Sequence, residues 1–254
     1  MQQLDVVCSP TELPAALANK DNALCMVIDV IRATTSLTVM GESGVAAVYI
    51  APTAVAAHDM VTLVDNPILV GEVFGLKPDG FDLGNSPAEI QRYTPISGRN
   101  LIFVTTNGTK TVNVCRTLGA SSIIAASLRN ALAVATYALE QPDLPQLVIA
   151  CAGRDDRVAL DDLLTAGIIT ELIVAQAQLR GREIELTEGA GLARHLARTT
   201  KNIVTALETS SAGRSVIGHG LGEDIAYCAA TSVTSIIPAV DMTSKQPVFH
   251  FIQA

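Results

Sequence analysis

The chain has 254 residues with 25 acidic and 17 basic side chains, which gives a net charge of −8 at pH 7. So acidic a chain lacks the positive surface that nucleic acids require, and we therefore expect no nucleic-acid partner. Hydrophobic residues make up 49% of the sequence, which excludes a disordered chain. The longest apolar run falls far short of the roughly 20 residues that a membrane helix needs, so we expect no membrane partner.

The cysteines indicate the compartment. They are five in number, and no two of them form a Cys-x-x-Cys pair, which argues against a disulfide framework or a structural zinc site. The first residues show neither a basic start nor a long apolar stretch, so we expect no signal peptide. Together these features predict a cytoplasmic protein.

Short β-rich runs alternate with helical patterns along the chain. Strands are predicted at residues 4–9, 24–30, 45–50, 68–71, 101–105, 122–126, 147–151, 235–240 and 248–252. Helices are predicted at 33–42, 53–64, 87–93, 109–118, 130–140 and 160–179, and residues 187–230 form a helical region. This alternation is typical of a layered α/β fold with a largely parallel or mixed sheet, helices on both faces and a helical C-terminal region. We expect a single domain over 1–254, with a candidate subdomain boundary near residue 95.

Polar residues follow several of the predicted strands. In an open α/β sheet, ligands bind beyond the carboxyl ends of the strands, so loops after parallel strands should converge. The side chains placed there are Asp29, Arg32, Thr34, Thr35, Glu72, Asp82, Asn85, Thr106, Asn107, residues 127–130 and Arg154. We therefore expect a ligand site at this edge of the sheet.

Several of these positions also have purely structural interpretations. The pair Asn107-Gly108 could form a hairpin turn, but the ten helix-compatible residues after it favour a helix start that suits an anion. Asp82 and Asn85 could serve only to organise their glycine-rich loop. Asp161 and Asp162 could simply stabilise the start of a helix. Asp29 is harder to explain in this way, because a carboxylate that ends a buried strand needs a partner or a metal.

Two local patterns suggest phosphatase chemistry. Cys151 and Arg157 have the spacing of cysteine-dependent phosphatases, although the acidic residues between them would repel a phosphate dianion. Asp29 resembles the nucleophile of haloacid-dehalogenase-like phosphatases, but Ile31 stands where those enzymes carry a second aspartate. Both patterns are incomplete alternatives.

Four segments taken together are more specific. Residues 27–35, 80–87 and 105–109, followed by 151–153 with 160–162, resemble the 2-phosphosulfolactate phosphatase (ComB-like) family in order and approximate spacing. The resemblance covers nearly the whole chain. It implies a magnesium-dependent acid phosphatase that converts 2-phospho-3-sulfolactate to 3-sulfolactate and phosphate in coenzyme M biosynthesis, with an α/β fold and a homodimeric assembly. Asp155 and Asp156 stand where members usually carry small residues, so another small anionic phosphate ester is an alternative substrate.

Under this hypothesis the residues divide into three roles. Asp29 and Asp82 are the expected Mg²⁺ ligands, with Glu72 or Asp162 as the third, since Mg²⁺ prefers carboxylate oxygens and substrate phosphate. Arg32 and Arg154 would clamp anionic groups. The hydrogen-bond donors would be Thr34, Thr35, Asn85, Thr106 and Asn107. Asp29, Arg32 and Asp82 are the expected catalytic residues.

The reaction itself leaves alternatives open. Direct attack by water and a covalent aspartyl-phosphate at Asp29 are both compatible with the sequence, and the missing second aspartate favours water. A non-catalytic domain that binds a phosphate ligand is the alternative from another functional class. The excess of acidic residues at the predicted site favours a metal-dependent enzyme over this binder.

Overall fold

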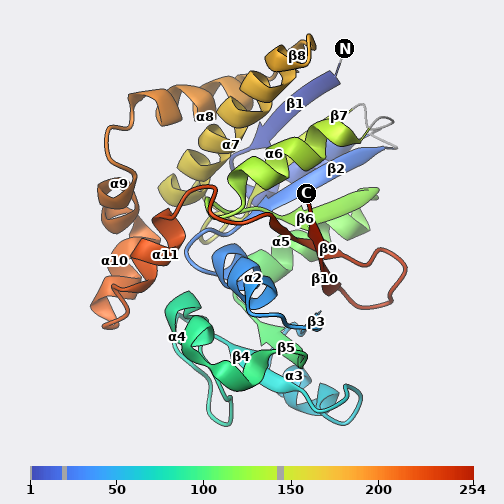
Figure 1. Cartoon of the computed structure of the whole chain (residues 1–254), viewed down its shortest axis with the longest axis vertical. Helices are drawn as coiled ribbons and strands as arrows, with labels where there is room; N and C mark the ends of the chain where they lie inside the picture. The colour runs from blue at the N-terminus through green and yellow to red at the C-terminus, as the bar shows by residue number, and fades with distance from the viewer. Residues whose placement is uncertain (1, 19–21, 142–145) are drawn as a thin grey trace.

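Ten strands form one sheet in the part of the chain that this computed structural model describes, namely residues 2–18, 22–141 and 146–254. In chain order they are β1 (Gln2–Val7), β2 (Ala23–Ile28), β3 (Ala47–Ile50), β4 (Ile68–Gly71), β5 (Asn100–Val104), β6 (Ser122–Ala125), β7 (Gln146–Cys151), β8 (Ile184–Leu186), β9 (Ile236–Val240) and β10 (Val248–Gln253). Across the sheet the order is β4-β5-β3-β10-β9-β6-β2-β7-β1-β8 (Figure 1).

Helices cover the sheet and form most of the C-terminal region. They are α1 (Leu13–Leu17), α2 (Ala33–Glu42), α3 (Ala54–Met60), α4 (Pro87–Arg92), α5 (Gly108–Thr117), α6 (Ala131–Glu140), α7 (Leu160–Leu179), α8 (Glu188–Thr199), α9 (Ile203–Thr209), α10 (Ser211–Gly218) and α11 (Asp224–Ala229), with 3₁₀ turns at Pro10–Glu12 and Thr94–Ile96. The predicted layered α/β class is confirmed. Within the described ranges, the helices all lack the combination of length and apolar character needed to span a membrane.

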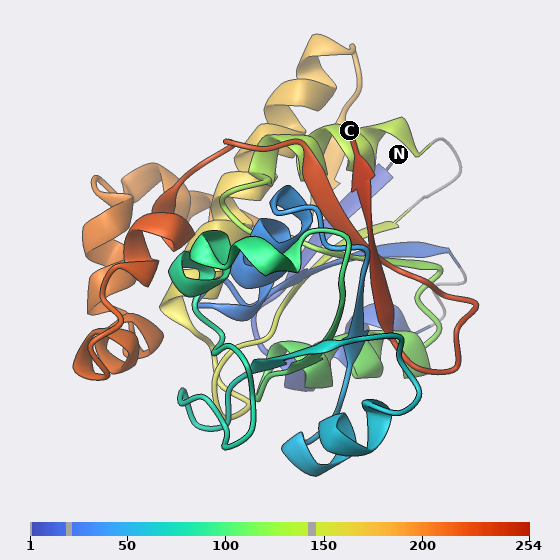
Figure 2. The same cartoon turned by 60° about the horizontal axis from the view of Figure 1, so that its bottom comes forward.

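The sheet is mixed and consists of two parallel blocks. One block is β6-β2-β7-β1-β8 and the other is β4-β5-β3. The hairpin of β9 and β10 runs between them and is antiparallel to its neighbours on both sides (Figure 2). Strands from both sides of residue 95 share this sheet, because β5 lies between β3 and β4.

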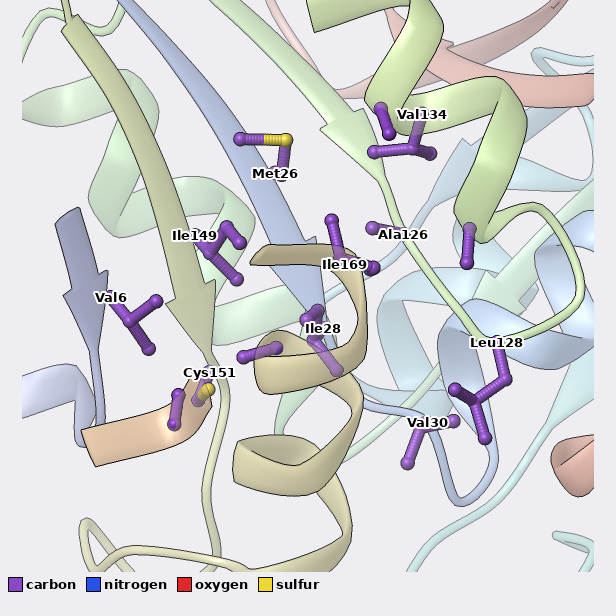
Figure 3. Close-up of a cluster of buried hydrophobic side chains, with 14 of the residues drawn as sticks. Val6, Met26, Ile28, Val30, Ala126, Leu128, Val134, Ile149, Cys151 and Ile169 are labelled. Carbon is purple, nitrogen blue, oxygen red and sulfur yellow. The ribbon is translucent and has the colours of Figure 1, made fainter. Parts of the chain in front are cut away.

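Strand β2 shows how the core is built on both faces. Successive side chains of a strand point to opposite faces, and all six residues of β2 are buried. Met26 and Ile28 lie in a cluster with side chains of α6 and α7, such as Val134 and Ile169 (Figure 3). Cys25 and Val27 face the opposite way, into a cluster that also receives Phe103 of β5. Because both blocks contribute to this second cluster, the sheet curves around it, and loops from the two blocks reach one site.

The local start signals in the sequence are confirmed. Ser86 precedes α4 and its hydroxyl accepts the Glu89 N–H at 3.1 Å, with Pro87 as the first helical residue. Gly108 begins α5, so the Asn107-Gly108 pair starts a helix and does not form a hairpin turn. The short strand β8 was not predicted. Its three residues carry little pattern of their own and pair with β1 through the tertiary fold.

Candidate active site

A cavity of about 700 Å³ opens where the loops after β2, β4, β5 and β7 meet the first turns of α7 and α10. The sequence predicted the convergence of these four loops. The loop after β6 is an exception, since Ser127 and Asn130 are fully buried and bond to each other. The charged residues that line the cavity are five acidic ones, Asp29, Glu72, Asp155, Asp161 and Asp162, and four basic ones, Arg32, Arg154, Arg157 and Arg214.

Asp29 directly follows β2 and lies among the acidic residues of the cavity. Its carboxylate accepts the Gly108 N–H from the start of α5 at 2.8 Å. Burial raises the pKa of Asp29 to about 7, and the charges of Glu72 and Asp161 add to this effect, while hydrogen bonds from backbone N–H groups oppose it. The site therefore holds Asp29 at a net cost in its charged form.

The first turn of α7 contributes two further carboxylates. Asp162 accepts the N–H of Val30 and the N–H of Gly153, both at 2.9 Å, and so joins the loops after β2 and β7. Burial first, and then the charges of Asp161 and Asp29, hold the pKa of Asp162 well above its usual range. Asp161 and Asp162 are each 3% exposed. An acidic residue can stabilise a helix start while exposed to solvent, so their burial calls for another explanation.

Asp161 is the functional candidate that sequence reasoning missed. Burial raises its pKa to about 6, while hydrogen bonds from its own backbone N–H and from the Ser210 side chain, together with the charge of Arg154, oppose this rise. Its buried Oδ1 has no hydrogen-bond partner among the described residues. The signal for it was present, since adjacent acidic residues open a helix that directly follows a strand and its loop. A helix start also has a purely structural explanation for acidic residues, which is why the sequence alone does not single out Asp161.

Glu72 joins the loop after β4 to the loop after β5 through hydrogen bonds. Its Oε1 accepts the N–H of Thr106 at 2.7 Å and the Thr106 hydroxyl at 2.9 Å, and its Oε2 accepts the Gly75 N–H at 2.6 Å. The Thr106 hydroxyl, expected to serve a substrate, therefore donates to Glu72. Asn107 is half-buried and lines the cavity as expected.

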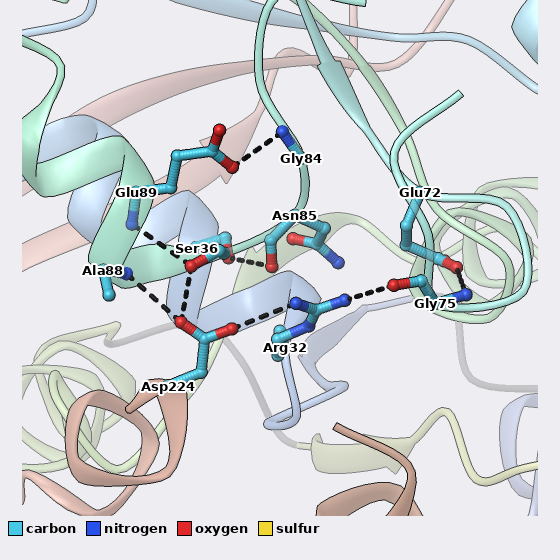
Figure 4. Close-up of polar contacts among 10 residues, drawn as sticks. Arg32, Ser36, Glu72, Gly75, Gly84, Asn85, Ala88, Glu89 and Asp224 are labelled. Atoms are coloured by element: carbon cyan, nitrogen blue, oxygen red, sulfur yellow. Dashed lines mark hydrogen bonds and ion pairs between the residues drawn. The ribbon is translucent and has the colours of Figure 1, made fainter. Parts of the chain in front are cut away.

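Among the basic residues of the cavity, Arg32 is buried. Its guanidinium donates to Asp224 and to the Gly75 carbonyl, each at 3.0 Å (Figure 4). Asn85 lies beside it, 4% exposed, and its Oδ1 has no partner among the described residues. Arg154 is exposed at the rim, where it donates to the Ser211 carbonyl at 3.2 Å. Arg32, Asn85 and Arg154 thus all lie where a ligand could reach them.

Three predicted site residues do not line the cavity. The Thr35 hydroxyl is fully buried and donates to the Val30 carbonyl at 2.8 Å, while the Thr34 hydroxyl accepts the Asp29 N–H at 3.3 Å. Both threonines thus serve the turn that places Asp29. Asp82 is exposed, and its carboxylate accepts the Leu69 N–H at 2.8 Å. At about 3.3 Å per strand residue, that contact lies roughly 10 Å back along β4 from Glu72.

A divalent cation fits the acidic residues of the cavity on chemical grounds. The described residues contain no group of three or more His, Cys, Asp or Glu side chains close enough together to hold a metal ion. Mg²⁺ does not require one, since it is usually bound by one or two carboxylates together with waters and substrate phosphate. The unpartnered Oδ1 of Asp161 and the mutual repulsion of Asp29 and Asp161 are what a bound cation would relieve.

Cys151 belongs to the core and not to the cavity. It is fully buried beneath α7 among apolar side chains (Figure 3). Burial, followed by the charge of Asp162, holds the pKa of its thiol well above the usual range. Arg157 lies on the exposed turn. A nucleophilic cysteine needs an accessible thiolate, so this geometry gives the cysteine-phosphatase alternative no support.

Comparison with known proteins decides the family. The family model described as 2-phosphosulpholactate phosphatase matches residues 8–243. The chain belongs to this family. It is 36% identical over 217 residues to a protein of Deinococcus radiodurans, covering 85% of this chain and 87% of that one. It is 35% identical over 215 residues to a protein of Thermus thermophilus, covering 85% and 86%.

A third relative, from Carboxydothermus hydrogenoformans, is 33% identical over 227 residues and covers 89% of both chains. All three relatives are described as probable 2-phosphosulfolactate phosphatases. The resemblance seen in the sequence motifs is thereby confirmed. As a member of this phosphatase family, the protein is an enzyme of the phosphoric monoester hydrolase class, which favours the catalytic hypothesis over a non-catalytic binder.

Proposed function

We propose that this phosphatase hydrolyses 2-phospho-3-sulfolactate to 3-sulfolactate and phosphate, with Mg²⁺ as its cofactor. The observation that carries the proposal is that buried carboxylates and the buried Arg32 line one cavity. The charges of Glu72 and Asp161 raise the pKa of Asp29, and Asp161 Oδ1 has no hydrogen-bond partner among the described residues. A phosphate ester bridged to these carboxylates by a divalent cation would relieve their repulsion and accept hydrogen bonds from Arg32, because cations and guanidinium groups together neutralise phosphoryl oxygens.

Asp29 and Asp161 are the proposed ligands of the cation. Asp161 contributes the Oδ1 that has no hydrogen-bond partner among the described residues. Asp29 lies close enough to Asp161 for the charge of Asp161 to raise the pKa of Asp29. Glu72 and Asp162 already accept backbone N–H groups with both oxygens, so in this proposal they hold the surrounding loops. When bound, Mg²⁺ would polarise the phosphoryl oxygens of the ester.

The chain's own groups would bind and orient the ester. Arg32 donates to anionic oxygens from its buried position, and Arg154 does so from the rim. A water molecule attacks phosphorus opposite the ester oxygen, a new P–O bond forms as the ester P–O bond breaks, and the proton of that water passes to the leaving oxygen. Attack by water is preferred to an aspartyl-phosphate at Asp29, because Ile31 replaces the second aspartate of the covalent pattern.

Phosphate release tests the proposal. Purified protein should release phosphate from 2-phosphosulfolactate with Mg²⁺, and EDTA should abolish this release until Mg²⁺ is restored. Asp161→Asn should lose both Mg²⁺ affinity, measured by calorimetry, and turnover. The matched control is Asp156→Asn on the loop that precedes α7, an exposed residue that pairs with Lys110 at 2.6 Å. Turnover in EDTA would overturn the magnesium proposal, and turnover only of other small phosphate esters would overturn the substrate.

We also propose a cytoplasmic homodimer that acts in coenzyme M biosynthesis, as the family resemblance implies. The support for the assembly and the pathway is the resemblance, and the support for the location is the cysteine usage of the chain. Light scattering coupled to size-exclusion chromatography tests the assembly, since a mass near twice 26.6 kDa is expected.

A further inference from the structure

Arg32 is a buried cation with a fixed set of partners. Its side chain is 4% exposed, and it occupies the position just before α2. A guanidinium has five N–H donors. One donates to Asp224 and one to the Gly75 carbonyl, and the other three have no hydrogen-bond partner among the described residues. Because Arg32 lines the cavity, these remaining donors are the ones available to an anion.

Asp224 fixes Arg32 from outside the cavity. It lies in the first turn of α11, is 1% exposed, and does not line the cavity, so it cannot touch a ligand there. One carboxylate oxygen accepts the Arg32 guanidinium, and the other accepts the Ser86 hydroxyl at 2.6 Å and the Ala88 N–H at 3.4 Å (Figure 4). Asp224 therefore ties α11, the start of α4 and the loop after β2 at one point.

The acidic residues of the cavity offer Arg32 a competing set of partners. Gly75 stands between the two charges, since its carbonyl accepts from Arg32 while its N–H donates to Glu72. Without the Asp224 carboxylate, a flexible guanidinium would be drawn toward Glu72 and Asp29, because an unpaired buried charge is costly. Its donors would then neutralise the carboxylates, and no anion could use them.

We propose that Asp224 is a positioning residue that orients the Arg32 guanidinium toward the anionic group of the substrate and keeps it from the acidic cluster. The inference rests on the proposed function for the identity of that substrate. The alternative is that Asp224 only holds α11 and α4 together. The two differ in their predictions, because a positioning role acts through Arg32 alone and a structural role does not.

A double-mutant cycle separates the two roles. The variants are Arg32→Gln, Asp224→Asn and the double variant, each measured for KM and kcat with 2-phosphosulfolactate and for binding of inorganic phosphate by calorimetry. Asp224→Asn should raise KM about ten- to a hundredfold with a smaller change in kcat, since a small misplacement of a binding group can cost about 10²-fold. The double variant should lose no more kcat/KM than Arg32→Gln, and it should melt at a higher temperature than either single variant.

The matched control is Glu223→Gln, the neighbouring residue in an exposed ion pair with Arg92, which should keep wild-type kinetics. If Asp224→Asn lowers the melting temperature but leaves KM and phosphate binding unchanged, the positioning role is wrong. The positioning role is also wrong if the losses in kcat/KM of the two single variants multiply in the double variant. If Asp224→Asn does not fold, the double variant is compared with Arg32→Gln alone, and a lower kcat/KM of the double variant overturns the positioning role.

Failure of the proposed function gives a different result. Wild-type protein that binds inorganic phosphate but does not turn over 2-phosphosulfolactate rejects the proposed substrate, and phosphate binding by the four proteins then tests the role of Asp224. Wild-type protein that neither binds phosphate nor turns over the ester overturns both.

Discussion

The backbone N–H of Gly108 donates to the Asp29 carboxylate at 2.8 Å and joins the two parallel blocks of the sheet at the cavity. Gly108 begins α5 after β5, and Asp29 follows β2. A Cβ on Gly108 would lie 3.1 Å from Asp29 Oδ2 and 3.3 Å from Ala33 Cβ. The absence of a side chain at Gly108 is therefore what lets the two loops approach.

Gly108→Ala should reduce turnover with little loss of stability. The added methyl group must displace Asp29, while alanine is a better helix former than glycine by about 1 kcal/mol, so the effects on folding oppose each other. We expect kcat/KM to fall about ten- to a hundredfold, as small misplacements of reacting groups do. Steady-state kinetics and thermal melts measure both quantities.

The control for this prediction is Gly191→Ala in α8. A Cβ there meets nothing within 4 Å, so this variant should keep wild-type turnover and gain roughly 0.5–1 kcal/mol in stability. Full activity of Gly108→Ala would show that the Asp29 position is not critical.

Asp82→Asn should leave turnover within about twofold of the wild type. Asn keeps an oxygen that can accept the Leu69 N–H, and the side chain lies outside the cavity. Phosphate-release assays with Mg²⁺ titrated from micromolar to millimolar test this expectation. A weakened Mg²⁺ response would return Asp82 to the ligand set that the sequence suggested.

The difference between Asp82 and Asp29 shows how far sequence reasoning reaches. Asp29 and Glu72 each come directly after a strand, so the strand fixes their position within one residue. Asp82 comes eleven positions after β4 ends, and the chain turns back so that Leu83 pairs beside Val70. A strand end predicts the place of the next residue, whereas a long loop can return anywhere along the strand.

Helix rotation and long-range packing account for the other misses. Thr34 and Thr35 follow Arg32 in sequence, but each helical residue turns by about 100°, which directs these hydroxyls inward. Asp224 meets Arg32 across 192 positions, and no local pattern in the chain marks that contact. The alternating pattern predicted the layers, because burial of whole strands such as β2 leaves a clear periodic signal.

Alkylation should spare the enzyme. In the described part of the chain the five cysteines form no disulfide and all are buried, and the raised pKa of Cys151 keeps its thiol protonated at neutral pH. We expect native protein treated with iodoacetamide to retain turnover, with Cys151 unmodified by mass spectrometry. Protein unfolded in guanidinium before treatment is the control, and its cysteines should react. Loss of turnover in step with modification of Cys151 would restore the cysteine-phosphatase alternative.

Asp29→Asn should stabilise the protein at neutral pH while abolishing turnover. The pKa of Asp29 is raised to about 7 in the folded state, and near 3.9 in the unfolded chain. Between these values the folded state binds more protons, so wild-type stability falls as pH rises from about 4 to about 7 and then levels off. The variant does not lose stability in this way, so its free energy of unfolding should exceed that of the wild type by an amount that grows between about pH 4 and pH 7 to roughly 1–3 kcal/mol. Urea unfolding at a series of pH values without Mg²⁺ measures this difference.

A control of opposite sign is available in Asp241. Hydrogen bonds from Thr243 lower the pKa of Asp241, so its contribution to stability is present above the unfolded pKa and is lost as pH falls. Asp241→Asn should therefore lower the free energy of unfolding at neutral pH, whereas Asp29→Asn should raise it. Saturating Mg²⁺ should reduce the difference in free energy of unfolding between the wild type and Asp29→Asn. A bound cation stabilises the ionised Asp29 carboxylate, which only the wild type has. An Asp29→Asn protein that is less stable than the wild type at pH 7.5 would contradict the repulsion that we infer within the acidic cluster.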